Sequence, residues 1–406
     1  MMDNWIKENF DITTLLVVLS LILMGFTAVY SATYDAGAST FFHRQLFFAG
    51  IGVIIMVLTV IIPFRTLQLF SYPLYGISLI ILVMVLFTGK VIAGSKSWFG
   101  IQGLGLQPSE IVKVTTILAL ASYLSNPRIN LSKLKYLLTS FIFVLIPVSL
   151  ILLQPDVGTA LIYLGTLLLV LYWAGISKFA LLTLLAPAAS AVAALFGITA
   201  FAIVIAATLI ILFLLRENRL LSAIVFSITV VVGVSVQFIF SRFEPYQQKR
   251  ILTFLNPDAD PLGAGYNVIQ SKIAIGSGGF FGKGYLQGSQ TQLNFIPAQW
   301  TDFIFCVPGE EFGFVGALII LLFFVILLYR GIKIASIVKN RYASLVAIGI
   351  VSSYAVHITI NIGMSMGIMP VIGVPLPFLS YGGSNLITNI TMAGLLLNMY
   401  VNRKEY

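Results

Sequence analysis

The sequence contains very little cysteine, histidine or charge. Among its 406 residues there is one cysteine, Cys306, and there are two histidines, His43 and His357. A single cysteine excludes a disulfide framework within the chain and a cysteine-based metal cluster, and two histidines argue against a histidine-based zinc site. Only 9% of the residues are charged, whereas soluble domains carry about 25%. A large extramembrane domain of ordinary composition is therefore excluded.

Apolar residues, in contrast, make up 59% of the chain. A helix needs about 20 predominantly apolar residues to cross a bilayer, and twelve segments fit. They are 12–31, 45–63, 72–89, 109–125, 136–153, 155–176, 179–197, 199–215, 221–240, 313–332, 344–365 and 382–401. We predict an all-α polytopic transmembrane bundle of ten to twelve spans, forming a single membrane domain over residues 1–406. Residues 179–215 are expected to form an extra helical pair.

The distribution of charge predicts the orientation of the spans. A net charge of +9 is typical of Lys and Arg in cytoplasmic loops, so we expect no nucleic-acid partner. Residues 1–11 lack the basic leader of a cleavable signal peptide, so the first span is expected to be retained. With the N-terminus in the cytoplasm, most Lys and Arg fall inside. Both termini are then cytoplasmic, and residues 241–312 form one long, structured outer loop.

Three ionisable residues fall within or at the start of predicted spans, where charge is costly and marks candidate functional sites. Glu110 and Lys113 share one helical face because they are three residues apart, with Ser109 as a candidate helix cap. They fit a structural ion pair and a substrate-contacting pair equally well. Asp156, preceded by Pro155 in the expected first helical turn, fits either a helix cap or a polar cavity.

Asp302 lies in the outer loop between Thr301 and the apolar run Phe303–Phe305. Partial desolvation at the membrane surface would raise the pKa of its carboxyl group and make it a better base. An ordinary surface aspartate is the alternative interpretation. Glu310 and Glu311 directly precede the next span and are expected to cap it.

Two glycine-rich segments complete the candidates. The run Gly276–Gly279 lies between Lys272 and Lys283 and lacks the ending of a P-loop. It fits either close approach of backbone amides to a phosphate or a flexible loop. The segment Ser380, Tyr381, Gly382, Gly383 and Ser384 opens the last span. It fits either close helix packing or an anion site at a helix terminus, and packing is the simpler use.

Together these segments resemble the SEDS proteins (shape, elongation, division, sporulation), and among them the elongation type. The matching pieces, in chain order, are Gln107–Glu110 with Lys113, Gln154–Ala160, Asp260–Tyr266, Gln270–Gly278, Thr301–Phe305, Gly309–Gly313 and Gly373–Phe378 with Ser380–Ser384. Two features depart from the family pattern. The family usually has ten spans rather than twelve, and it often places a histidine where this chain has Trp300.

The resemblance implies a peptidoglycan glycosyltransferase of the bacterial cytoplasmic membrane, with its active site on the outer face. Such enzymes polymerise lipid II by an inverting reaction that forms β-1,4 linkages, and they work with a class B penicillin-binding protein. Asp302 matches the family's essential aspartate and is the expected base. Glu110, Lys113 and Asp156 would line a membrane-level cavity, with the substrate's lipid tail among membrane lipids between spans.

The leaving pyrophosphate would require positive charge. The candidate cations are Lys113, Arg242, Lys249, Arg250, Lys272 and Lys283. A divalent cation, Mg²⁺ or Mn²⁺, is expected to assist, and its ligands are unknown. No organic cofactor is expected.

Three alternatives stay open at this point. Glu110, Lys113 and Asp156 would fit the substrate pathway of a lipid II flippase equally well. A division-type or sporulation-type paralogue would have the same chemistry. A scaffold for the penicillin-binding protein would need no catalytic Asp302.

Overall fold

The fold is known from a computed structural model of the chain. It describes residues 10–34, 38–92, 95–101, 104–215, 218–240, 242, 260–261, 263, 265–293 and 295–405. Helices dominate these residues, in which the only sheet is a small antiparallel one. Its strands are β1 (Lys90–Ile92), β2 (Ser95–Ile101) and β3 (Leu104–Leu106), in the order β1-β2-β3.

Each predicted span corresponds to a helix. The helices are α2 (Ile12–Ala32), α3 (Ala38–Ile61), α4 (Phe64–Thr88), α5 (Pro108–Ser125), α6 (Leu134–Leu152), α7 (Val157–Trp173), α8 (Lys178–Leu195), α9 (Ile198–Leu215), α10 (Arg219–Phe240), α15 (Gly313–Ile337), α16 (Arg341–Ser365) and α17 (Gly383–Val401). Within the described residues, nine of them are long and apolar enough to cross a membrane. The predicted class, an all-α polytopic membrane protein, is confirmed.

The remaining three are α5, α7 and α17, and the polarity of α17 has a physical reason. Helix α7 has 17 residues, and α17 contains several asparagines that are buried by protein. Asn398 of α17 donates hydrogen bonds to the carbonyls of Thr59, Val60 and Ile62 at the end of α3, over 3.0, 3.0 and 2.6 Å. Polar side chains are tolerated there because neighbouring helices, rather than lipid, surround them.

The described chain divides into two compact units. The first contains residues 1–173 and 267–406, and the second contains residues 174–266. In the second unit, α8 and α9 occupy the segment of the expected extra helical pair, and Gly197 between them has a left-handed φ of +107°. Ser190 of α8 donates a hydrogen bond to the carbonyl of Thr229 in α10, over 2.8 Å. The second unit is therefore a three-helix group with polar as well as apolar contacts.

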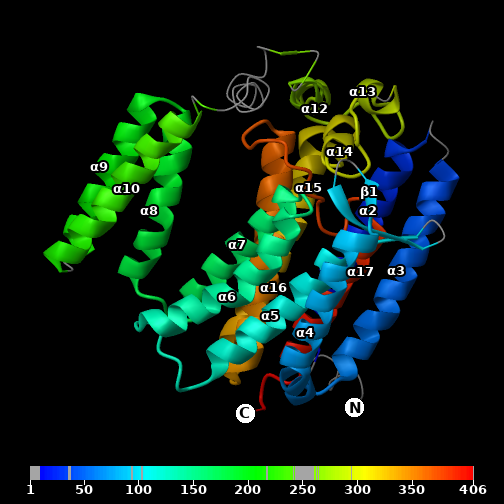
Figure 1. Ribbon diagram of the computed structural model, residues 1–406. Helices are drawn as coiled ribbons and strands as arrows, with labels where there is room; N and C mark the ends of the chain where they lie inside the picture. Colours follow the sequence, from blue (N-terminus) through cyan, green and yellow to red (C-terminus); the bar gives the residue numbers. More distant parts are fainter. Residues whose placement is uncertain are drawn as a thin grey trace. The chain divides into compact units, whose positions relative to one another are not determined.

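In the first unit, the two ends of the chain lie at the same end of the bundle (Figure 1). Arg330 near the end of α15 pairs with Asp11, the N-cap of α2, over 2.5 Å. The amide of Lys339 donates to the carbonyl of Arg403, just after α17. At the opposite end, Gln299 donates to the carbonyl of the last residue of α2, over 2.8 Å. The segment that leads to Asp302 therefore lies opposite the chain ends.

The described part of the predicted outer loop 241–312 is folded. It contains α12 (Tyr266–Ser277), α13 (Ser289–Gln292) and α14 (Cys306–Glu311). Ser271 of α12 contacts Cys306 of α14 over 2.9 Å and donates a hydrogen bond to the carbonyl of Ser365 at the end of α16. The loop is thus fastened to the bundle by buried contacts that hold the segment between α13 and α14 in place.

Candidate functional site

Asp302 lies in the turn between α13 and α14, and the main chain around it is held at each residue. The carbonyls of residues 300–302 accept hydrogen bonds from the amide of Tyr381, the hydroxyl of Ser380 and the side-chain amide of Asn361, respectively. The distances are 2.8, 2.6 and 2.8 Å. Two of the three donors come from the segment before α17, and the third comes from α16. The backbone that carries Asp302 is therefore fixed from two sides.

The Asp302 carboxyl group is only partly exposed. Burial is the largest influence on its pKa and, although a hydrogen bond from Thr301 acts in the opposite direction, raises it to about 6. The nearby negative charge of Asp156 contributes to this rise of the pKa. A Cβ atom at Gly373 would lie 3.4 Å from Asp302 Oδ2, so that glycine borders the carboxylate. Asp302 thus has the properties of a desolvated base.

Asp156 caps α7, as one of the two interpretations predicted. Its carboxylate accepts from the amide and hydroxyl of Thr159, over 3.0 and 2.8 Å. The side-chain amide of Gln107 also donates to it, over 3.1 Å. The expectation for Pro155 was wrong, because α7 begins at Val157 and Pro155 precedes it with a φ of +31°. Gln107, at the start of α5, is a neighbour of this acid that the sequence did not single out.

Glu110 and Lys113 form a buried ion pair of 2.8 Å on one face of α5. Lys113 Nζ also lies 3.0 Å from Nε2 of His357, a fully buried residue of α16. Ser109 does not cap the helix, because Gln107 is the N-cap and makes no side-chain cap bond. The space beside Lys113 measures about 10 Å³, hardly enough for one water molecule. This pair is enclosed by protein in the structure.

A long connection between α16 and α17, here called the 366–382 loop, lies next to Asp302 and to the start of α7, where Asp156 lies. Gly373 has a φ of +69°, which glycine adopts without strain. A Cβ atom at Gly158, two residues after Asp156, would come within 2.6 Å of the carbonyl of Ile372. The backbone of the loop thus approaches α7 closely and also borders Asp302. Close approach of this kind is possible only where a side chain is missing.

The segment Ser380–Ser384 ends this loop and starts α17. Besides the bonds of Ser380 and Tyr381 to the Asp302 segment, a Cβ at Gly383 would lie 2.5 Å from the ring of Phe48 in α3. The hydroxyl of Ser384 accepts from the amide of Gln107 and donates to the carbonyl of Gly105, both over 2.9 Å. In the described structure the motif therefore joins the Asp302 segment to α3, β3 and α5.

The candidate cations differ in their surroundings. Lys283 Nζ pairs with Glu310 over 2.7 Å, and Arg242, in the second unit, lies over the ring of Phe238. Lys249 and Arg250 lie outside the described residues.

Lys272 of α12 is exposed and has no ion pair to another described residue. A Cβ at Gly367 would lie 3.2 Å from Cδ of Lys272, so the lysine stem packs on the 366–382 loop. The same loop therefore borders both Lys272 and Asp302.

Glu310 and Glu311 do not cap α15, contrary to expectation. Its N-cap is Phe312, with no side-chain hydrogen bond. Glu310 instead accepts from the amides of Gln290 and Thr291 at the start of α13, both over 2.9 Å. Burial opposes ionisation of Glu310, but these bonds and Lys283 outweigh it, and its pKa is lowered. Glu311 accepts a hydrogen bond from the amide of Leu286 over 3.1 Å, so both glutamates hold the outer loop in place.

The described residues contain no group of three or more His, Cys, Asp or Glu side chains that could hold a metal ion. The part of the chain described therefore offers no cluster of three such side chains to the expected Mg²⁺ or Mn²⁺.

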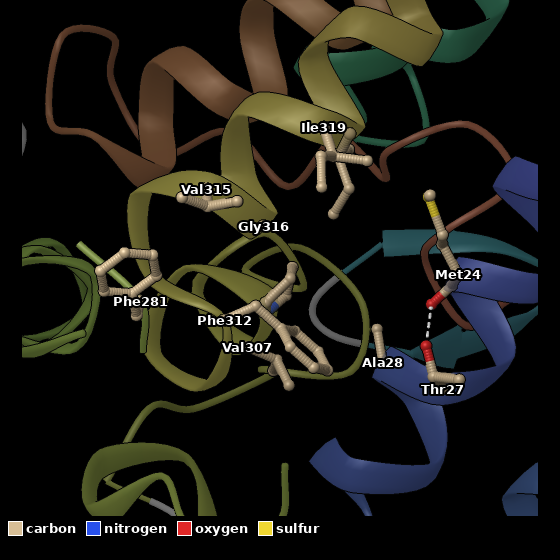
Figure 2. Close-up of a pocket in the computed structure, with 11 residues that line it drawn as sticks. Met24, Thr27, Ala28, Phe281, Val307, Phe312, Val315, Gly316 and Ile319 are labelled. Carbon is tan, nitrogen blue, oxygen red and sulfur yellow. Dashed lines mark hydrogen bonds between the residues drawn. The ribbon is translucent and has the colours of Figure 1, made fainter. Parts of the chain in front are cut away.

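An apolar cavity of about 360 Å³ lies between α2, α14 and α15. Figure 2 shows Met24, Thr27 and Ala28 of α2 on one side and Phe312, Val315 and Ile319 on the other. Phe281 reaches the cavity from the outer loop. Its lining is mostly apolar side chains.

These features define a polytopic helical membrane protein. It has a desolvated carboxylate at one end of its bundle and a buried ion pair on α5. The chain belongs to the family described as "Cell cycle protein", which groups the FtsW, RodA and SpoVE types and matches residues 9–207 and 196–405. The resemblance to the SEDS proteins is thereby confirmed.

Individual relatives match over nearly the whole chain. Stage V sporulation protein E of Bacillus subtilis is 36% identical, with 97% of each chain covered. The peptidoglycan glycosyltransferase MrdB of Escherichia coli is 35% identical, covering 98% of this chain and 96% of its own. A solved chain from a peptidoglycan synthase complex that coordinates polymerization and crosslinking superposes with a TM-score of 0.75 at 28% identity. It covers 98% of this chain and 99% of its own.

The Glu310 contacts predict unequal effects of two substitutions. Glu310→Ala should lower the free energy of unfolding by about 2–4 kcal/mol, because it leaves buried amide donors without acceptors. Lys283→Ala should cost about 0–1 kcal/mol, because Lys283 is partly exposed and Glu310 keeps its amide donors. Thermal unfolding of the purified variants in detergent measures both. Equal losses would show that the charge pair, rather than the amide contacts, holds the loop.

Proposed function

We propose that this protein is a peptidoglycan glycosyltransferase that polymerises lipid II into glycan strands, with Asp302 as the general base. One observation carries the proposal: a carboxylate with a pKa raised to about 6 sits on backbone fixed by three hydrogen bonds. A base is most effective when its pKa lies near the working pH. The printed names of relatives such as MrdB support the same activity.

The proposed reaction is a single inverting displacement. Asp302 accepts the proton of the GlcNAc 4-hydroxyl as the oxygen of that hydroxyl attacks C1 of MurNAc. The bond from C1 to the pyrophosphate oxygen breaks, and the pyrophosphate leaves with the electron pair. The α linkage of the donor becomes a β-1,4 linkage, and no covalent enzyme intermediate is needed. General-base assistance of this kind contributes about 10²- to 10⁴-fold.

Lys272 is the proposed partner of the leaving pyrophosphate. It is exposed and borders the same loop as Asp302, whereas the charge of Lys113 is taken up by Glu110 and that of Lys283 by Glu310. A divalent cation is proposed to bind through the substrate phosphates, as Mg²⁺ often does with only one or two protein carboxylates. No cage of protein side chains is proposed for it.

The apolar cavity is the proposed seat for part of the substrate's lipid tail. Its wall includes α14, which follows Asp302 within a few residues. The opposite wall belongs to α2, a candidate membrane span. A hydrocarbon chain could therefore enter from the bilayer while the sugar and pyrophosphate stay at the polar end.

The proposed location is the bacterial cytoplasmic membrane, with both termini cytoplasmic and Asp302 on the outer face. The placement of Asp302 opposite the chain ends supports this orientation. The proposed partner is a class B penicillin-binding protein. A similar chain belongs to a complex for polymerization and crosslinking, which supports a partner that forms crosslinks.

Replacing the base should abolish polymerisation without unfolding the protein. Asp302→Asn, tested in liposomes with lipid II and Mg²⁺ or Mn²⁺, should lower the rate at least about 100-fold because the amide cannot accept the proton. The control is Gln287→Ala, which replaces an exposed residue of the outer loop. This variant should polymerise lipid II normally. An active Asp302→Asn variant would exclude Asp302 as the base. Translocation of lipid II without polymer by the unaltered protein would favour the transporter alternative.

The raised pKa predicts the acidic limb of the pH–rate profile. The base must be ionised, so the rate should fall as the pH drops through about 6. Asp156→Asn removes a negative charge that raises the pKa of Asp302 and should move the limb to lower pH, while keeping the cap on α7. Thr301→Val removes a hydrogen bond that lowers this pKa and should move the limb to higher pH. Shifts in the reverse directions would contradict the assignment.

The elongation role is also a proposal, because sporulation-type and MrdB relatives match almost equally well. Depletion of an elongation enzyme should make rod-shaped cells round, since sidewall growth stops while division continues. Depletion of a division enzyme should make them filamentous. Microscopy of a depletion strain distinguishes the two, and filaments would exclude the elongation role.

A further inference from the structure

His357 has a neighbour on each of its two ring nitrogens, although it takes no part in the reaction proposed above. Its Nε2 lies 3.0 Å from Lys113 Nζ, and its Nδ1 lies 3.1 Å from the carbonyl oxygen of Pro375. The ring is fully buried in α16. It therefore links the Glu110–Lys113 pair of α5 to the 366–382 loop.

The two neighbours determine the tautomer of the ring. An ammonium group has only hydrogens to donate, and Lys113 is paired with the carboxylate of Glu110. Nε2 must therefore accept from Lys113. The carbonyl of Pro375 can only accept, so Nδ1 carries the proton and donates it. The imidazole is thus neutral, with its hydrogen on Nδ1.

The hydrogen bond from His357 to Pro375 holds the part of the 366–382 loop that borders the Asp302 carboxylate. Asn361, one helical turn after His357, donates to the carbonyls of Val374 and Asp302 over 2.7 and 2.8 Å. His357 and Asn361 therefore hold two successive loop carbonyls, those of Val374 and Pro375. Gly373, just before them, borders Asp302 Oδ2.

We infer that His357 is a positioning residue for Asp302: oriented by the Glu110–Lys113 pair, it fixes the 366–382 loop against the carboxylate through Pro375. The inference rests on the proposed function. It gives the enclosed ion pair a role that requires no contact with substrate. It also explains why a lysine and a glutamate are buried in a span with almost no free space beside them.

Two substitutions separate the two bonds of the ring. In His357→Asn the side-chain amide can replace Nδ1–H and donate to Pro375, but it cannot reach Lys113. In His357→Gln the side-chain oxygen can replace Nε2 and accept from Lys113, but the bond to Pro375 is lost. Ser353→Ala is the matched control, because Ser353 is buried one turn earlier on α16 and its hydroxyl has no partner among the described residues.

The experiment is polymerisation of lipid II in liposomes, with kcat and KM measured separately and thermal unfolding measured in parallel. His357→Gln should lower kcat about 10- to 100-fold, as expected for a misplaced catalytic group, with KM changed less than about twofold. His357→Asn should restore kcat to at least ten times that of His357→Gln, and Ser353→Ala should match the unaltered protein. His357→Phe keeps an aromatic ring of similar size but can form neither hydrogen bond, so it should behave like His357→Gln. If the glutamine variant does not fold, the phenylalanine variant takes its place in the comparison.

A ratio below ten between the asparagine and glutamine variants, or a loss in KM rather than kcat, overturns the inference. Loss of kcat that only follows the loss of thermal stability also overturns it, because a purely structural histidine would give that result. An unaltered protein that makes no polymer would instead refute the proposed function itself.

Discussion

The geometry of the site depends on hydrogen bonds between the 366–382 loop and the segment that carries Asp302. An aspartate near a membrane surface could take many positions, but three consecutive carbonyls around Asp302 are each held by a donor from α16 or from the end of this loop. The loop is in turn held by Asn361 and His357. These specific hydrogen bonds fix the backbone that carries the carboxylate.

The same arrangement sets the chemistry of the carboxylate. Placing an acid where water is scarce disfavours its charged form, and this raises the pKa of Asp302 to about 6. A nearby acid, Asp156, acts in the same direction and is itself held by Gln107 and by the start of α7. The carboxyl group stays ionised near neutral pH and accepts protons more readily than an exposed aspartate would.

Polar side chains inside the bundle connect the helices. Asn398 satisfies the last carbonyls of α3, and Ser384 joins α17 to β3 and α5. In hydrocarbon such groups would each lose a hydrogen-bonding partner, which explains why they lie on helices enclosed by others. Helices that are too short or too polar to count as candidate membrane spans, such as α17, are therefore among those that form the site.

The sequence alone determined the class of the protein and the approximate positions of the helices in its twelve predicted spans, because a membrane span leaves a long apolar segment whatever its neighbours are. It also located Asp302, Asp156 and the Glu110–Lys113 pair, since charge in an apolar context stands out, and helical spacing placed the pair on one face. The roles of Glu310, Glu311, Ser109 and Pro155 were misjudged because local spacing suggests a cap whenever a polar residue or proline precedes a helix. Only the tertiary structure decided that Glu310 bonds to α13, and that His357, Asn361 and Gln107 border the site. Contacts between residues more than two hundred positions apart, such as Lys113 with His357, leave no periodic or local signal, because they exist only once the helices have packed.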